Sequence, residues 1–334
     1  MSDISKLDLR GRTVLVTGGG GMLGSQLTKL LVAHDATVRV FDNSSAYPFP
    51  YLERYLGNLD VEVIDGDVRD SSALGNALRG IELVVHAAAY ADVAACIANY
   101  DEDFSTNVHG TFNVLDQCTR AGVERLVFIS SASVYGEREG EAAASCFAED
   151  DAPMPLSTYA HSKLWGEVQG RLMHCLHGLS VLSLRLFSVY GPPQVPKEGS
   201  HSWCVACFVM RGLRGKPLIV NGDGGQVRDF VHVTDIARAV ASALVAGSAD
   251  GRVLNVGTGR PTRVVEVAQM VAELLGGLEI QFGPQRRGDP HGGYADLGRT
   301  RADLGWVARM PLRQGIADYV EWAKANSDLV PTWL

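Results

Sequence analysis

A glycine-rich stretch near the amino terminus places the strongest constraint on the fold. The apolar run Thr13–Val16 is followed by the glycine-rich segment Thr17–Gly24, and Ser25–Ala33 has the pattern of a helix. A strand, a glycine turn and a helix in this order form the site that holds a dinucleotide pyrophosphate. Four successive glycines also fit a flexible turn, but the flanking strand and helix favour the phosphate site.

Three of these glycines each meet a separate steric need of such a site. Gly18 permits the tight turn, Gly21 lets the backbone come close to a phosphate, and Gly24 lets the helix pack on the strand. The amino terminus of the helix adds amide donors and a partial positive charge, both of which attract a phosphate.

An acidic residue further along the chain indicates which dinucleotide is bound. Thr37–Phe41 is expected to be a second strand, and Asp42 follows it about twenty residues beyond the glycines. A carboxylate at this place accepts hydrogen bonds from both ribose hydroxyls of NAD and repels the extra phosphate of NADP. Asp42 also suits the cap of a turn with Asn43 and Ser44. Its position favours the ribose contact and predicts NAD.

The rest of the pattern alternates strands with helices. Further strands are expected at Val61–Ile64, Leu83–His86, Arg125–Ile129, Val181–Leu186 and Val253–Val256. Helices are expected at Tyr100–Ala121, Tyr159–His177 and Thr234–Ala246, and an irregular connection at Asn43–Asn58. This alternation predicts an α/β fold with a Rossmann-like doubly wound parallel sheet and right-handed crossovers.

Ligands of such a sheet bind outside the carboxyl ends of its strands. Five positions at or just beyond strand ends are therefore expected to lie together at this edge: Gly18, Asp42, Asp67, Ala87 and Ser131. His86 ends its strand and is either a ligand or a packed, hydrogen-bonded histidine, of which the second is favoured.

A tyrosine and a lysine four residues apart form the candidate catalytic pair. Tyr159 and Lys163 share one face of the expected helix. An ammonium group beside a phenol favours the phenolate, which lowers the pKa of the phenol from about 10. The spacing alone also fits a surface tyrosine and a solvated lysine. Downstream of the glycine turn, and with Ser131 at a strand end, the catalytic interpretation is favoured.

Composition narrows the classes of function. The 334 residues carry a net charge of −8, which argues against a surface that binds nucleic acid. No apolar run approaches the roughly 20 residues that a membrane span needs, and the polar first residues predict no secretion signal. The six cysteines are scattered without a zinc-site pattern, so we expect free thiols, no metal and a cytoplasmic protein.

The motifs resemble those of a known family. The spacing Gly18-x-x-Gly21-x-x-Gly24 and the pair Tyr159-x-x-x-Lys163 are typical of the extended short-chain dehydrogenases/reductases. Residues 131–136, 185–192, 222–233 and 255–259 indicate its branch of nucleotide-sugar epimerases and dehydratases. The resemblance covers nearly the whole chain and is closest to UDP-sugar 4-epimerases.

The resemblance implies NAD as the cofactor and assigns its contacts. They are expected on Gly18, Gly21, Met22, Leu23, Asp42, Asn43, Asp67, Val68, Ala87, Ala88, Ala89, Tyr159 and Lys163. Among these, Asp67 is expected to hold the adenine amino group, and Lys163 to reach the nicotinamide ribose as well.

The resemblance also implies a reaction. Tyr159 is expected as the acid/base, Ser131 as its hydrogen-bonding partner at the reacting oxygen, and Lys163 as the group that tunes Tyr159. Related dehydratases and decarboxylases carry acids just after the position of Ser131, where this chain has Ala132 and Ser133. A nucleotide-sugar epimerase that inverts C4 through a 4-keto intermediate is therefore favoured. A reductase of 4-keto nucleotide sugars is the alternative, and a dehydratase, a decarboxylase or a silent NAD-binding scaffold is less favoured.

The expected contacts to a nucleotide-diphosphate sugar are Ser131, Ser188, Arg228, Arg286 and Asp289. Guanidinium groups suit the bidentate binding of a diphosphate, although Arg286 and the arginine after it also fit an exposed basic pair. Ser188 stands where the family often has asparagine. The segment 196–204 is unusual for the family and replaces a region that shapes the sugar pocket, so the identity of the sugar is not predicted. His201 and Trp203 in this segment are either pocket residues or loop packing.

The chain is expected to form two lobes and to pair with a second copy. Residues 1–189, with 229–259 returning to them, are expected to form the NAD-binding Rossmann domain. Residues 190–228 and 260–334 are expected to form a smaller α+β lobe that binds the nucleotide sugar. In the family, the helices that correspond to Tyr100–Ala121 and Tyr159–His177 pair across a two-fold axis, so a homodimer is expected.

Overall fold

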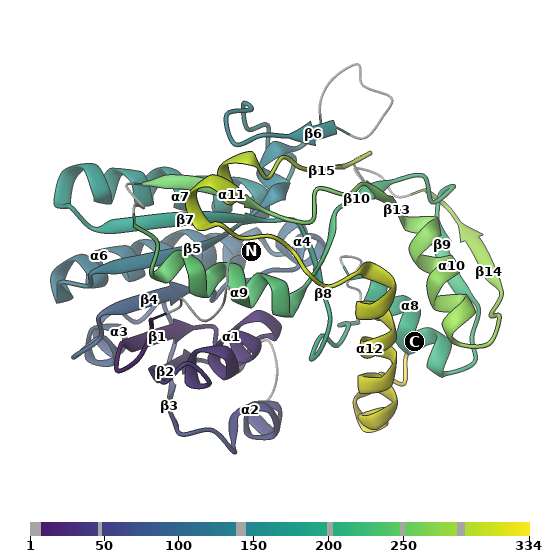
Figure 1. The fold of residues 1–334 in the computed structure, drawn as a ribbon, viewed down its shortest axis with the longest axis horizontal. Coiled ribbons are helices and arrows are strands. Elements are labelled where there is room, and N and C mark those ends of the chain that lie inside the picture. The colour runs from purple at the N-terminus through teal and green to yellow at the C-terminus, as the bar shows by residue number, and fades with distance from the viewer. Residues whose placement is uncertain (1–7, 46–48, 138–144, 199–202, 248–250, 286–290) are drawn as a thin grey trace.

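Seven parallel strands form the central sheet of this protein (Figure 1), in the order β12-β7-β5-β4-β1-β2-β3. The computed structural model describes residues 8–45, 49–137, 145–198, 203–247, 251–285 and 291–334, and of residues 49–52 the backbone alone. The strands of the sheet are β1 (Thr13–Thr17), β2 (Thr37–Asp42), β3 (Val61–Asp65), β4 (Leu83–His86), β5 (Arg125–Ser131), β7 (Ser180–Leu186) and β12 (Arg252–Val256).

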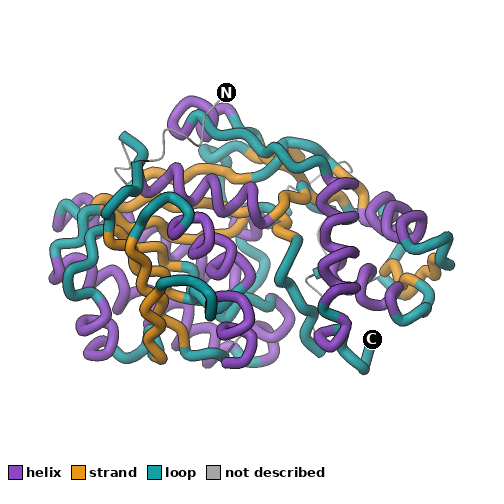
Figure 2. The backbone as a smooth tube through the Cα atoms, turned by 60° about the horizontal axis from the view of Figure 1, so that its bottom comes forward, coloured by secondary structure: helices purple, strands orange, loops and turns teal. Residues whose placement is uncertain are grey.

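Helices cover both faces of the sheet (Figure 2), because its strands are apolar on both sides. Val14 and Val16 of β1 pack with Leu27 of the first helix on one face, whereas Leu15 packs with Leu74 on the other. The first face is covered by α1 (Met22–Val32) and α9 (Val233–Leu244), and the second by α3 (Ser71–Ala77), α6 (Thr111–Ala121) and α7 (Thr158–His177). The predicted doubly wound sheet is therefore confirmed.

A smaller group of elements lies at one end of the sheet, at the right of Figure 1. Its apolar core joins α8 (Cys204–Leu213), α10 (Val264–Leu274), α12 (Leu312–Ala325) and the parallel pair β9 (Leu218–Asn221) and β14 (Ile280–Gly283). Three further two-stranded pairs complete the strands: β6 (Ser145–Phe147) with β15 (Gly293–Ala295), β8 (Ser188–Tyr190) with β11 (Phe230–His232), and β10 (Val227–Arg228) with β13 (Thr262–Arg263). Helix α11 (Gly298–Leu304) packs on β12 and α9. The expected boundaries of the two lobes stay a prediction.

One sequence-based expectation for local structure was wrong. The connection Asn43–Asn58 contains the helix α2 (Phe49–Leu56), because a proline in the first turn of a helix costs no hydrogen bond. The helix expected at Tyr100–Ala121 has these bounds, but it is not uniform. It runs from α5 (Tyr100–Asp103) through the π-helical segment Phe104–Gly110 into α6. Such widened turns occur often at functional sites.

Three short elements complete the described part of the chain. The helix α4 (Val93–Ala98) precedes α5, and the 3₁₀ turn Ala132–Tyr135 follows β5 directly. A second 3₁₀ turn, at Ser327–Leu329, follows α12. In the part of the chain that the structure describes, no helix is both long and apolar enough to cross a bilayer. The cytoplasmic location stays a prediction.

Candidate active site

The glycine turn lies at the carboxyl end of β1 and packs against the end of β4. Gly18 has a φ of +70°, and a Cβ on it would lie 2.5 Å from the amide nitrogen of Ala88. The amide of Gly21 donates to the carbonyl of Gly18 (3.1 Å), and a Cβ on Gly24 would overlap that carbonyl oxygen. No described side chain caps the amino terminus of α1. The first amides of this helix therefore face the edge where a pyrophosphate is expected.

Asp42 ends β2 and joins the glycine turn to the next loop. Its carboxylate accepts hydrogen bonds from the backbone amides of Gly20 (2.8 Å) and Ser44 (2.7 Å). Burial raises the pKa of Asp42, and the two backbone hydrogen bonds oppose that rise. Both interpretations of this residue therefore have a geometric basis. It caps the turn at Ser44, and it retains acceptor capacity beside the glycines for ribose hydroxyls.

Asp67, expected at the adenine, is held in a hydrogen-bond network. Arg69 donates three hydrogen bonds to its carboxylate, from the backbone amide (2.8 Å), Nε (2.9 Å) and NH2 (2.6 Å). Asn43 Nδ2 donates a further one (2.9 Å). These contacts, led by the Arg69 side chain, lower the pKa of Asp67 to about 2. About four acceptor positions of a carboxylate are thereby filled, so an adenine amino group has to share or replace one of them.

Arg69 is a site residue that the sequence analysis missed. Besides Asp67, its NH1 group contacts both carboxylate oxygens of Glu102 in α5, at 3.1 and 3.2 Å. The signal was present as an arginine two residues after the expected adenine contact, but its second partner is distant in the sequence. The remaining expected contacts lie along the same edge: Met22 and Leu23 begin α1, Val68 is buried after β3, and Ala87–Ala89 follow β4.

His86 is a packed histidine, as favoured from the sequence. Its Nδ1 lies 2.8 Å from Thr17 Oγ1 and its Nε2 lies 3.0 Å from Thr111 Oγ1. Burial and the nearby charge of Lys163 lower the pKa of His86 to about 3. The imidazole is therefore neutral and links the end of β1 to the start of α6.

Ser131, Tyr159 and Lys163 come together where β5 meets α7. Ser131 Oγ accepts hydrogen bonds from the backbone amide (3.2 Å) and hydroxyl (2.9 Å) of Ser133, so its own proton remains available for another acceptor. Lys163 is 3% exposed, and its Nζ donates to the carbonyl of Ile129 (2.9 Å) and lies 5.8 Å from the centre of the Tyr159 ring. The expected catalytic group is therefore assembled.

The pKa values of this group differ from the sequence-based expectation. Burial raises the pKa of Tyr159, and the hydrogen bond from Ser131 opposes the rise without cancelling it. Burial lowers the pKa of Lys163 to about 8, although the charges of Asp103 and Glu167 favour the ammonium form. The expectation that Lys163 brings the pKa of Tyr159 below 10 was wrong for the chain by itself, because desolvation has the largest effect on the phenol and Lys163 is not among the groups that lower its pKa.

The substrate side is described in part. Ser188 is half-buried in β8 and donates its amide to the carbonyl of Asp229 (2.9 Å). Arg228 in β10 donates from NH1 to the carbonyl of Val227 (2.8 Å), and its guanidinium group lies against Gly292. Trp203 packs on the apolar core of the smaller lobe, which favours the packing interpretation. The expected residues Arg286 and Asp289, like His201 and Arg287, lie outside the described residues.

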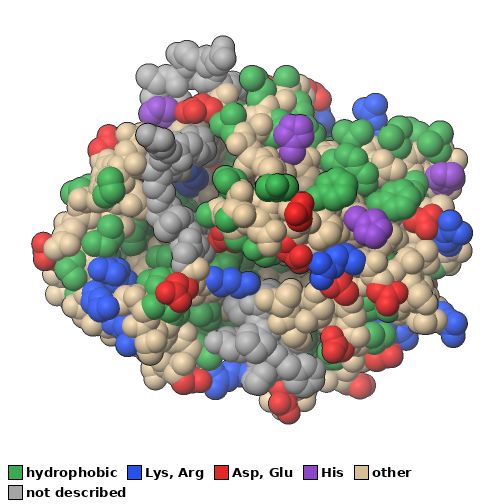
Figure 3. Space-filling view, turned by 180° about the vertical axis from the view of Figure 1, so that it is seen from behind, with side chains coloured by type: hydrophobic (Ala, Val, Ile, Leu, Met, Phe, Trp, Pro, Cys, Tyr) green, Lys and Arg blue, Asp and Glu red, His purple; other side chains and the backbone are tan. Residues whose placement is uncertain are grey.

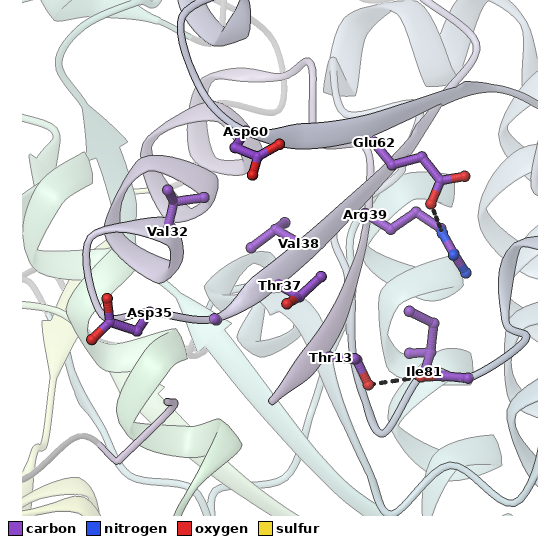
Figure 4. Close-up of a pocket in the computed structure, with 11 residues that line it drawn as sticks. Thr13, Val32, Asp35, Thr37, Val38, Arg39, Asp60, Glu62 and Ile81 are labelled. Carbon is purple, nitrogen blue, oxygen red and sulfur yellow. Dashed lines mark hydrogen bonds and ion pairs between the residues drawn. The ribbon is translucent and has the colours of Figure 1, made fainter. Parts of the chain in front are cut away.

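A depression of about 440 Å³ lies at the opposite edge of the sheet (Figure 4), where Thr13 and Thr37 begin their strands. Arg39 in this depression donates from Nε to Glu62 (2.6 Å) and from NH1 to the carbonyl of Ala77 (2.6 Å). The depression is therefore separate from the candidate active site. Among the described residues, no group of three histidine, cysteine or acidic side chains is arranged to hold a metal ion.

Comparison with known proteins identifies the family. Residues 14–257 match the profile of the NAD dependent epimerase/dehydratase family. Because this match covers more than half of the sequence, the chain belongs to that family.

Individual relatives agree over nearly the whole length. A putative UDP-glucose 4-epimerase of Methanocaldococcus jannaschii is 31% identical over 318 residues, which cover 94% of this chain and 99% of the relative. The crystal structure of UDP-glucose 4-epimerase from Thermotoga maritima with UDP-glucose superposes with a TM-score of 0.86 at 31% identity, over 94% of this chain and 99% of that chain. The Thermus thermophilus UDP-glucose 4-epimerase in complex with NAD superposes with a TM-score of 0.83 at 35% identity, over 92% of this chain and 98% of that chain.

The residues at the carboxyl edge fit NAD. The turn at Gly18 leaves no room for a side chain, and no described side chain caps the amino terminus of α1, so backbone amides face the expected phosphates. A carboxylate, not an arginine, stands at the end of β2, which suits a free ribose over a phosphorylated one. The protein is thus an NAD-dependent enzyme of this family.

The packing of Gly24 yields a first prediction. Gly24→Ala is expected to lower the free energy of unfolding by roughly 1–3 kcal/mol, because its Cβ overlaps the Gly18 carbonyl and pushes α1 from the turn. The same change is expected to weaken NAD binding. Thermal denaturation and calorimetric titration with NAD measure the two effects. Gly247→Ala is the matched control, since a Cβ there meets no atom within 4 Å. Equal stability of the two variants would contradict the packing role.

Proposed function

We propose that this protein is a nucleotide-sugar epimerase that inverts C4 through a transient 4-keto sugar. The observation that carries the proposal is the placement of Ser131 at the end of β5 and of Tyr159 and Lys163 in the first turns of α7, with Lys163 buried and its Nζ 5.8 Å from the centre of the phenol ring. This arrangement offers a proton acceptor and a proton donor to one substrate oxygen.

Each residue has a step that its contacts support. Tyr159 takes the proton of the C4 hydroxyl, while Ser131, whose proton is directed by Ser133, donates to the same oxygen as it becomes a ketone. Bound NAD supplies a reversible acceptor for the hydride of C4. Turning of the keto sugar presents its other face, to which the same hydride would return at C4, while Tyr159 gives the proton back to the oxygen. The result is inversion without net oxidation.

Two positive charges, the Lys163 ammonium group and the oxidised nicotinamide ring, are proposed to stabilise the Tyr159 phenolate. Burial raises the pKa of Tyr159 in the chain by itself. Lys163 gives one positive charge, and an oxidised nicotinamide ring adds another, which favours the phenolate when NAD is bound. We therefore propose that Lys163 stabilises the phenolate and contacts the nicotinamide ribose. The other expected NAD contacts are proposed in the roles that the family resemblance implies.

The residues after Ser131 favour epimerisation over elimination. Ala132 and Ser133 form the 3₁₀ turn that follows β5, and neither carries a carboxyl group. A dehydratase or a decarboxylase needs an additional acid near the reacting carbon, so these two activities are less favoured. A reductase of 4-keto nucleotide sugars uses the same three residues and is the second candidate. Net consumption of NADH or NADPH distinguishes it.

We propose a nucleotide-diphosphate sugar as the substrate, as in the solved relative that holds UDP-glucose. Arg228 is the described cation proposed for the diphosphate, and its guanidinium group is kept in place by packing against Gly292. Ser188 is proposed to contact the sugar with a short hydroxyl, where a longer amide is common in the family. Arg286 and Asp289 complete the proposed set.

A panel of UDP-, dTDP-, GDP-, CDP- and ADP-sugars tests the reaction. With NAD and no other reductant, NMR is expected to find one sugar converted to its C4 epimer. Tyr159→Phe is expected to lower kcat by at least 100-fold while NAD still binds, because it removes the acid/base and leaves the cofactor site. Tyr100→Phe is the control, since Tyr100 is 65% exposed. Full activity of Tyr159→Phe would refute the mechanism, and stoichiometric NADH loss would favour the reductase.

The charge of Asp42 is proposed to set the preference for NAD over NADP. Asp42→Asn removes the charge and keeps one side-chain oxygen, which can accept from only one of the Gly20 and Ser44 amides, because these bond to different oxygens of the carboxylate. Loss of one cap hydrogen bond affects both cofactors alike, so the ratio of their affinities reports the ribose role. We expect the ratio of the NADP and NAD dissociation constants to fall at least tenfold, about 1.4 kcal/mol. Titration calorimetry measures both constants. Asp65→Asn is the control, because Asp65 is an exposed carboxylate nearby. An unchanged ratio would contradict the ribose contact, and Asp42 would then act only as the cap of the turn.

We further propose a homodimer that pairs the helices α4–α7. Figure 3 shows hydrophobic side chains gathered on the face opposite to the view of Figure 1. Exposed apolar side chains of these helices are Ile97, Tyr100, Phe104, Phe112, Val168, Leu172 and Leu176. Large apolar patches of this kind mark interfaces between proteins. A second copy of the same chain presents the same patch about a two-fold axis.

The dimer is tested by a charge in the patch. Leu172→Glu is expected to raise the dimer dissociation constant at least tenfold, because it buries a carboxylate in an apolar contact. Size-exclusion chromatography with light scattering measures the mass as a function of concentration. Phe282→Glu is the control, an exposed apolar side chain on β14 outside the patch. A wild-type protein with the mass of one chain would rule out the dimer.

A further inference from the structure

A buried carboxylate, Asp103, lies next to the turn of α7 that carries Tyr159 and Lys163. Asp103 ends α5 and is 1% exposed. Its Oδ1 accepts a hydrogen bond from Asn107 Nδ2 (2.6 Å) in the π-helical segment and lies 3.0 Å from the hydroxyl of Ser162 in α7. Ser162 directly precedes Lys163, so Asp103 connects the π-helical segment to the catalytic turn of α7.

The orientation of this carboxylate is fixed by its neighbours. Asn107 accepts from the backbone amide of Tyr90 (2.8 Å) and donates to the carbonyl of Tyr90 (2.9 Å) as well as to Asp103. The amide of Asn107 therefore has no freedom to turn. The single proton of Ser162 is within reach of Asp103 and of the Tyr159 carbonyl (2.9 Å), which holds this turn of α7.

We propose that Asp103 is a positioning residue of the active site, which holds the Tyr159–Lys163 turn against the π-helical segment and provides the counter-charge for the buried ammonium group. The inference rests on the proposed function of the Ser131, Tyr159 and Lys163 group. It assigns no contact between Asp103 and the substrate.

The charges around Lys163 show why a counter-charge matters. Cys96 of α4, Asp103 of α5 and Glu167 of α7 each act to raise the pKa of the lysine, against a desolvation that lowers it to about 8. Glu167 is already paired with Arg185, at 2.7 Å. Burial raises the pKa of Cys96 to about 12, so this thiol is neutral. Among the described carboxylates that act on Lys163, Glu167 is paired with Arg185, whereas Asp103 has no ion pair with another described cation.

The remaining groups that face Lys163 are uncharged, apart from Tyr159, which titrates itself. His86 of β4 is neutral, because burial lowers its pKa to about 3. From β5, the Phe128 ring and the carbonyl of Ile129 contact Nζ. Tyr159 of α7 has its own pKa raised by burial and, to a smaller extent, by the charge of Asp103.

The sign of the effect follows from these contacts. Removing the negative charge of Asp103 makes the ammonium form of Lys163 less favourable, which lowers the pKa of the lysine. It makes the Tyr159 phenolate more favourable, which lowers the pKa of the phenol as well. The two groups titrate as a coupled pair, but both changes have the same direction. Both limbs of a bell-shaped pH profile therefore move to lower pH.

Asp103→Asn tests the charge, because the amide has the shape of the carboxylate. In the NAD complex, we expect both limbs of the kcat profile to move to lower pH by on the order of one unit. Asp101→Asn is the control, an exposed carboxylate on the same helix that is expected to move neither limb. An unmoved profile in Asp103→Asn, at normal fold and NAD binding, would overturn the counter-charge role.

A second readout is independent of any substrate. The near-ultraviolet absorbance of tyrosinate is titrated in the NAD complex, and the same titration of Tyr159→Phe is subtracted. Asp103→Asn is expected to lower the midpoint of the Tyr159 titration by on the order of one unit, and an unchanged midpoint would overturn the inference. An enzyme that turns over no nucleotide sugar would contradict the proposed function, while this titration still decides the role of Asp103.

Ser162→Ala tests the positioning role and serves if Asp103→Asn does not fold. The variant keeps the charge of Asp103 and removes its link to α7. We expect kcat to fall by roughly 3- to 10-fold with the pH limbs unmoved, on the order of the loss from one hydrogen bond. Unchanged kcat in Ser162→Ala would overturn the positioning role.

Discussion

The buried ammonium group of Lys163 is the interaction on which the candidate active site depends. A charge removed from water is costly unless other groups replace its hydration. Here the carbonyl of Ile129, the face of Phe128 and nearby carboxylates replace it, and they come from different elements. The sheet, α5 and α7 must therefore all be in place before this group is stable. The same charge helps to keep His86 neutral, which makes the histidine a structural link.

A second buried pair holds the catalytic helix one turn further on. Glu167 in α7 is paired with Arg185 in β7 (2.7 Å) and accepts a hydrogen bond from Ser130 in β5 (2.5 Å). Arg185 also lies over the ring of Tyr135 at 4.7 Å, and Tyr135 donates to Asn255 in β12 (2.6 Å). This network connects three neighbouring strands to α7, so Ser131 and Tyr159 have fixed relative positions. Such satisfied polar networks make a core specific in its geometry.

The parts of the site that could be predicted from the sequence are those whose geometry is set by residues close together in the chain. Gly18 and Gly24 were readable because the steric need of a tight turn is local. Tyr159 and Lys163 were readable because a spacing of four residues places both on one helix face. Glu167, four residues beyond Lys163, carried the same signal and was missed. The direction of the Tyr159 pKa was wrong, because the extent of burial is not visible in the spacing.

By itself, the sequence determined the order of strands and helices, the glycine turn and the shared helix face of Tyr159 and Lys163, the proposed acid/base pair. Backbone sterics and helix periodicity act over a few residues, and both are written in the local pattern. The tertiary structure alone decided the partners of these residues. Asp103 meets Ser162 across 59 positions of sequence, Tyr135 meets Asn255 across 120, and Arg69 joins Asp67 to Glu102 of α5. Electrostatic balance in a buried site depends on such distant partners, because desolvation and charge act through space and not along the chain.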